Sequence, residues 1–141
     1  MIKRALITLS LVSSLSLPMI SSAETAVIVH PSNGNAALDQ GTVKKIFLGK
    51  AKKFPDGSQA IPVDQGDDSP VKKGFLDTVV GKSPSQLKSY WSKRVFTGKG
   101  TPPKQVGSGA DVKKLVSENP ATIGYIDASE VDGSVKVVFT F

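Results

Sequence analysis

The sequence predicts a small α/β domain in which short strands alternate with helices around a mixed sheet. Two observations carry this prediction. Runs of β-branched and other apolar residues are typical of buried strands, and they recur at residues 25–30, 60–63, 122–126 and 135–139. The segments between them place apolar residues at helical spacing behind a polar capping residue. Alternation of this kind favours a small α/β sandwich with one modest core.

The first predicted helices begin at polar residues that can cap them. Asp39 stands before a helix that ends at Gly49, because aspartate caps and glycine terminates helices. Ser69 is followed by Pro70, which suits the first helical position, and that second helix ends at Gly81.

A third predicted helix follows directly, and the capping signal at its N-terminus is stronger. Ser83 and Gln86 have the spacing of a capping box. Trp91 and Val95 fall on one apolar stripe, which predicts that this stripe, with the tryptophan, faces the core. Residues 100–109 contain two consecutive prolines and predict an irregular loop before a last helix over 110–118.

Residues suited to catalysis or to metal binding are scarce. His30 is the only histidine, the chain has no cysteine, and no G-x-S-x-G motif supplies a serine nucleophile. The acidic groups around Asp64 and Asp132 lack the alternating ligands of a calcium loop. The sequence therefore predicts a protein that is not an enzyme and that has no cofactor and no metal. Asp132 and Gly133 predict a hairpin turn before the last strand.

The N-terminus has the pattern of a secretory signal peptide. Lys3 and Arg4 precede an uncharged segment over 5–20, and Ala23 ends a run of small residues. We expect residues 1–23 to be a signal peptide and residues 24–141 to be one periplasmic or secreted domain without a membrane span. Only one arginine, Arg94, lies in the expected domain over residues 24–141. Nucleic-acid binding is not expected, because lysine lacks the planar fork that grips phosphates and bases.

Several motifs occur together in an order that resembles a known family. They are V-K-K-I-F-L-G-K at residues 43–50, I-P-V at 61–63, Y-W at 90–91, P-P at 102–103 and A-T-I-G-Y-I at 121–126. This combination resembles the second lobe of the phosphate-binding component of bacterial phosphate ABC importers. It is more similar still to short, single-lobe secreted relatives of that protein. The resemblance implies a mixed-sheet sandwich like one lobe of a type 2 periplasmic-binding protein, with a solute-binding role.

The resemblance also implies an anion site in the loop after the I-P-V strand. There the family reads R-S-D-G-S-G-T, whereas this chain keeps the aspartate and the second serine and has lost the arginine and the threonine. A helix N-terminus can still bind an anion through backbone amides. The residues implied for the site are Gln65, Asp67, Ser69, Val71 and Lys72.

Two functions follow from this pattern and stay open at the level of sequence. One is weak recognition of phosphate or a related small oxyanion, linked to transport or sensing. The other is an interaction module without a ligand, which binds a partner protein or a second copy of itself through the half-cleft. Loss of the arginine favours the second, because charge-assisted hydrogen bonds from a guanidinium are among the strongest contacts to phosphate.

Overall fold

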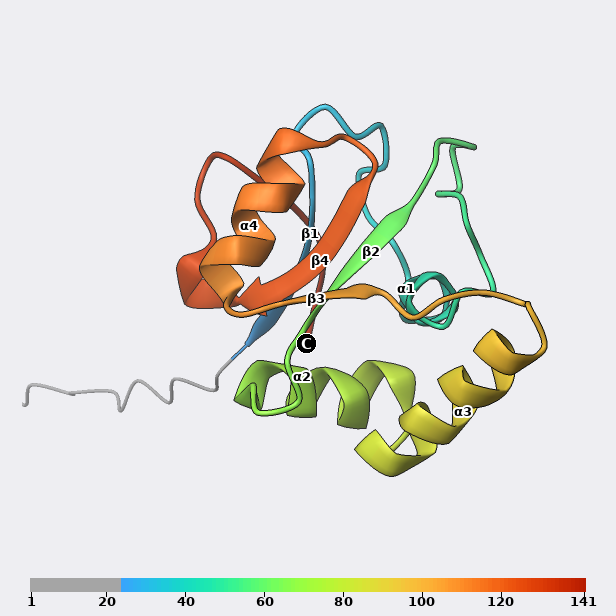
Figure 1. The fold of residues 1–141 in the computed structure, drawn as a ribbon. Helices are drawn as coiled ribbons and strands as arrows, with labels where there is room; N and C mark the ends of the chain where they lie inside the picture. The colour runs from blue at the N-terminus through green and yellow to red at the C-terminus, as the bar shows by residue number, and fades with distance from the viewer. Residues whose placement is uncertain (1–23) are drawn as a thin grey trace, which may run out of the picture.

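The computed structural model describes residues 24–141 and shows one five-stranded mixed sheet with helices on both faces (Figure 1). The predicted signal peptide, residues 1–23, lies outside the described residues. The strand order is β3-β2-β4-β1-β5. The strands are β1 (Thr25–Val29), β2 (Ile61–Gln65), β3 (Lys104–Val106), β4 (Thr122–Asp127) and β5 (Lys136–Thr140). The helices are α1 (Gln40–Phe47), α2 (Pro70–Phe75), α3 (Pro84–Phe96) and α4 (Gly109–Glu118), with a π-helical turn η1 (Leu76–Val80) and a short 3-10 turn η2 (Ala128–Glu130).

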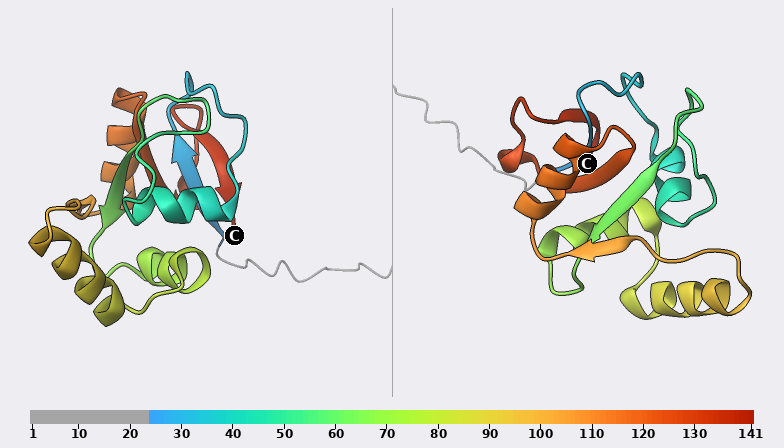
Figure 2. Two further views of the ribbon diagram at one scale, coloured as in Figure 1. Left: turned by 90° about the vertical axis from the view of Figure 1, so that its right-hand side faces the viewer. Right: turned by 45° about the horizontal axis from the view of Figure 1, so that its top comes forward.

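Strand β1 lies inside the sheet between β4 and β5, and it divides the core into two layers. Val27 and Val29 face the layer covered by α1, α2 and η1, whereas Ala26 and Ile28 face the layer covered by α4. Because side chains alternate across a strand, a strand covered on both faces is apolar at every position. This confirms the α/β sandwich predicted from the apolar runs. Figure 2 shows α1 and α4 on opposite sides of the sheet.

The predicted helix starts are present in the structure. The carboxylate of Asp39 accepts a hydrogen bond from the amide of Thr42 at 2.7 Å. The side chain of Ser69 caps α2, and Ser83 forms the expected reciprocal capping box with Gln86. The second predicted helix is not α-helical throughout, because its last five residues form η1 before Gly81 ends it in a left-handed conformation.

The hairpin predicted at Asp132 and Gly133 is wrong. β5 pairs antiparallel with β1 and not with β4, so the strands on either side of this turn are not neighbours. Asp132 still makes a local turn, in which its carboxylate accepts a hydrogen bond from the amide of Ser134 at 2.9 Å. The turn chemistry was therefore visible in the sequence, whereas the choice of partner strand was not.

The region around α3 differs from the prediction in two respects. Trp91 is buried, but Val95 on the same predicted stripe is 51% exposed, so α3 presents only part of its apolar stripe to the domain. The loop predicted over 100–109 contains the edge strand β3, which pairs in parallel with β2 through three residues. In both panels of Figure 2, α3 projects away from the sheet.

Candidate functional site

The loop implied by the family resemblance lies at the end of β2, where the chain turns into α2. Gln65 is the last residue of β2 and Ser69 is the N-cap of α2. The amide of Ser69 donates to the carbonyl oxygen of Gly66 at 3.0 Å, which closes a tight turn between them. Sequence and structure agree on this placement, because a serine followed by proline begins helices with an extended residue at the cap.

Gln65 and Ser69 are hydrogen-bonded to each other and to the protein around them. The side-chain amide of Gln65 donates to the carbonyl oxygen of Tyr125 at 2.8 Å. Its oxygen accepts the hydroxyl proton of Ser69 at 2.6 Å, while that hydroxyl accepts the amide of Lys72 at 3.2 Å. These polar groups satisfy one another inside the domain, so binding of an anion by either side chain requires breaking one of these bonds.

Lys72 is the charged centre of the loop. Its side chain is 3% exposed, and its ammonium nitrogen lies 2.8 Å from Asp67 and 3.1 Å from Asp64. Burial alone would lower the pKa of Lys72, but the hydrogen bonds and charges of the two aspartates outweigh it and raise the pKa above its usual value. Conversely, the hydrogen bond and charge of Lys72 lower the pKa of Asp67.

Asp64 is the member of the network that the family resemblance did not indicate. It is 7% exposed and accepts hydrogen bonds from the hydroxyl of Tyr125 and from the amide of Gln65. Burial, followed by the charge and hydrogen bond of Asp64, raises the pKa of Tyr125 far above its usual value. The sequence signal was weak, because an acid directly after an apolar strand can equally stand at the start of an exposed loop.

Val71 and Asp68 have different surroundings from the other loop residues. Val71 packs against the apolar core and offers no polar side-chain atom to an anion. Asp68 is exposed and adds a further carboxylate to the loop. Three carboxylates thus share this loop with one ammonium group, which makes the loop unfavourable for an additional anion.

Beside this loop lies an open groove of about 800 Å³, which we call the α3 groove. One wall is α3 and the other is the chain that leads into β3. The polar end of the groove is formed by the Asp64–Lys72–Asp67 network. The apolar part of its lining consists of Pro84, Leu87, Trp91, Val95, Phe96, Pro102 and Pro103.

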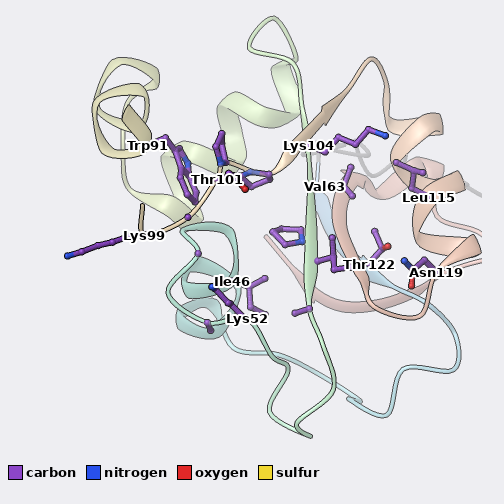
Figure 3. A pocket seen from close by; sticks show the side chains of 18 of the residues that line it. Ile46, Lys52, Val63, Trp91, Lys99, Thr101, Lys104, Leu115, Asn119 and Thr122 are labelled. Carbon is purple, nitrogen blue, oxygen red and sulfur yellow. The ribbon is translucent and has the colours of Figure 1, made fainter. Parts of the chain in front are cut away.

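A second groove, of about 580 Å³, adjoins the first on the other side of residues 102–103. It follows β2 at Ile61 and Pro62, where β3 no longer pairs with β2. Trp91, Pro102 and Pro103 line both grooves. In Figure 3 the indole of Trp91 and the side chains of Ile46 and Lys52 border this space, while Lys99 points away from it.

The described residues offer no arrangement for metal chemistry. Within residues 24–141 no three histidine or acidic side chains gather as they would around a metal ion. No helix in the same range is both long enough and apolar enough to cross a membrane. His30 contacts the hydroxyl of Ser32 at 2.7 Å through Nδ1, in an exposed turn after β1.

The sheet order, the two covered faces and the loop between β2 and α2 define a single lobe of a periplasmic-binding fold. Structural comparison finds this fold in solved proteins described as a phosphate ABC transporter substrate-binding protein and an ABC-type phosphate transport receptor. One chain, from Clostridium perfringens, is described as such a protein and was solved with bound phosphate. It is 25% identical and superimposes with a TM-score of 0.66 over 82% of the present chain and 45% of its own.

Two further solved structures give the same result at lower identity. An ABC-type phosphate transport receptor from Vibrio cholerae is 20% identical with a TM-score of 0.66, over 82% of this chain and 46% of that one. PstS from Borrelia burgdorferi is 15% identical with a TM-score of 0.61, over 82% and 47%. The present chain therefore spans somewhat less than half the length of these relatives, as the single-lobe prediction requires. No protein-family model and no curated protein sequence matches the chain.

Proposed function

We propose that this protein is a secreted or periplasmic interaction domain that keeps a solute-binding fold and binds a protein partner through the α3 groove. The observation that supports it best is that the anion-binding candidates of the loop after β2 already have partners inside the loop. Lys72 is already paired with Asp64 and Asp67, and Ser69 is already bonded to Gln65. The predicted signal peptide over residues 1–23 supports the location.

The apolar lining of the groove supports the same proposal. Val95 is 51% exposed and Phe96 is 92% exposed, and both lie along the groove wall. Large exposed side chains gathered at a groove are typical of protein interaction sites, whereas singly scattered ones are ordinary surface. Phosphate needs directed hydrogen-bond donors and gains nothing from such a wall.

Weak binding of phosphate or a similar oxyanion is the second candidate, through Gln65, Asp67, Ser69, Val71 and Lys72. It is supported by the bound phosphate of the Clostridium perfringens structure. An anion would have to displace the carboxylate of Asp67, which is exposed, from the ammonium group of Lys72. We therefore expect any such affinity to be low in the unaltered protein.

Calorimetric titration with inorganic phosphate separates the two candidates. We expect no saturable heat at millimolar phosphate for the unaltered protein. Asp67→Asn removes the competing carboxylate, and Asp68→Asn is the matched control because Asp68 is exposed and forms no ion pair. If the unaltered protein binds at millimolar phosphate and Asp67→Asn binds more tightly, the solute-binding candidate replaces the interaction candidate.

A further inference from the structure

Helix α3 presents an unpartnered face to the groove. It has 13 residues, and Trp91 alone among them is buried. Val95 and Phe96, at its C-terminal end, are two of the three large apolar side chains that are exposed among the described residues. Figures 1 and 2 show the helix standing apart from the sheet. An amphipathic helix that buries so little of its apolar surface in its own domain leaves that surface free for another.

The helix is nevertheless held in place, so the groove exists before anything binds. The hydroxyl of Tyr90 donates to the carbonyl oxygen of Leu48 at 2.6 Å. The guanidinium of Arg94 donates to the carbonyl oxygen of Gly49 at 3.2 Å and lies over the rings of Tyr90 and Trp91. These contacts fix α3 against the end of α1. A preformed groove binds more tightly, because less conformational entropy is lost on binding.

The two walls of this groove, α3 and the chain that leads into β3, carry basic side chains and no acidic ones. Residues 78–110 contain no aspartate and no glutamate. The same segment supplies six basic side chains: Lys82, Lys88, Lys93, Arg94, Lys99 and Lys104. Of these six, Lys88 lines the groove. At the inner end of the groove Asp64 and Asp67 share the single ammonium group of Lys72, so one negative charge remains there against the six basic side chains of this segment. A surface of this kind attracts acidic partners and repels basic ones.

Resting on the proposed function above, we propose that the partner presents an acidic segment with a bulky apolar side chain. The apolar side chain packs against Trp91, Val95 and Phe96, and the flanking carboxylates pair with Lys88 and with the other basic side chains of the groove walls. The hollow shape favours a polypeptide segment over a membrane surface, because a flat bilayer does not reach an indole that is 8% exposed between α3 and residues 102–103. A buried apolar anchor with a polar rim is the usual design of protein interfaces.

The test is selection of binders from a random library of displayed 12-residue peptides on the immobilised protein. We expect the enriched peptides to be rich in aspartate and glutamate around an aromatic or branched aliphatic residue. Trp91 is the only tryptophan of the chain, so binding of a synthesised peptide in the groove is read from its fluorescence. Affinity is expected to fall as salt is raised, since exposed charges are screened.

Three variants test whether the binding is at this groove. Phe96→Ser should weaken the selected peptide about tenfold or more, as loss of an apolar anchor does. Lys88→Glu should weaken it about fivefold, the range of an exposed ion pair. Lys114→Glu is the matched control, because Lys114 is exposed on α4 and does not line the groove. Its affinity should stay within about twofold of the unaltered protein.

The outcomes separate this inference from the proposed function. Enrichment of apolar or basic peptides that still perturb Trp91 overturns the acidic partner but leaves the interaction domain standing. Absence of any enriched peptide, together with saturable phosphate binding, overturns both. A Trp91 response to phosphatidylglycerol vesicles without peptide binding replaces the partner by a lipid surface, and concentration-dependent dimerisation that Phe96→Ser abolishes replaces it by a second copy.

Discussion

Replacing Lys72 by methionine removes the charge at the centre of the loop network while keeping most of the side-chain volume. Lys72 is 3% exposed, and its partner Asp64 is 7% exposed. Removing one member of a buried ion pair leaves an uncompensated charge and costs about 3–5 kcal/mol. Because domains of this size are stable by only about 5–15 kcal/mol, Lys72→Met should destabilise the protein severely.

Urea unfolding at neutral pH measures the loss, with Lys73→Met as the matched control because Lys73 is the exposed neighbour on the same helix. The double variant with Asp64→Asn should cost less than the sum of the single changes, since it removes both charges together. A loss below about 1 kcal/mol for Lys72→Met, equal to that of the control, would contradict a buried and paired Lys72.

Further variants test the packing and the charge of the domain. Trp91→Ala should cost roughly 3 kcal/mol by thermal unfolding, at the low end for a buried tryptophan because the indole also borders both grooves. A loss of stability near zero would show that the indole is not packed in the core. Gly124→Ala should cost about 1–3 kcal/mol, because a Cβ there would overlap Val112, whereas Gly133→Ala has free space and should be nearly neutral. Asp67→Asn should lower the stability at neutral pH by under about 1 kcal/mol, since the carboxylate is exposed. As the folded-state pKa of Asp67 is lowered, this difference should disappear when the pH falls through that pKa, and a constant difference down to pH 2 would refute the ion pair.

Much of the framework was predictable because it depends on local chemistry. The uninterrupted apolar run of β1 indicated a strand covered on both faces, and the structure confirms it. The caps at Asp39, Ser69 and Ser83 depend on a side chain and an amide three residues away, so both partners are close together in the sequence. The glycine of the I-G-Y-I motif has a tertiary reason instead, since the side chain of Val112 on α4 occupies the place where a Cβ at position 124 would stand.

The sequence predicted where the loop after β2 lies in the fold, but not the hydrogen bonds and the burial of its side chains. The sequence places Gln65, Asp67 and Ser69 close together around one loop, and the resemblance aligns Gln65 with the family's arginine. In the structure Gln65 is buried and bonded to the backbone of Tyr125, 60 residues away. Gln65→Arg would break that hydrogen bond, so this substitution is expected to change the stability of the domain.

The sequence by itself determined the α/β class, the helix starts, the scarcity of catalytic groups and the resemblance to one lobe of a phosphate-binding protein. Each of these depends on residue types, or on partners close along the chain. Only the tertiary structure decided that Lys72 is buried between Asp64 and Asp67, that β5 pairs with β1, and that α3 leaves Phe96 exposed beside a groove. Burial and long-range pairing depend on which surfaces meet after the chain has folded, and the periodicity of a single segment does not contain that information.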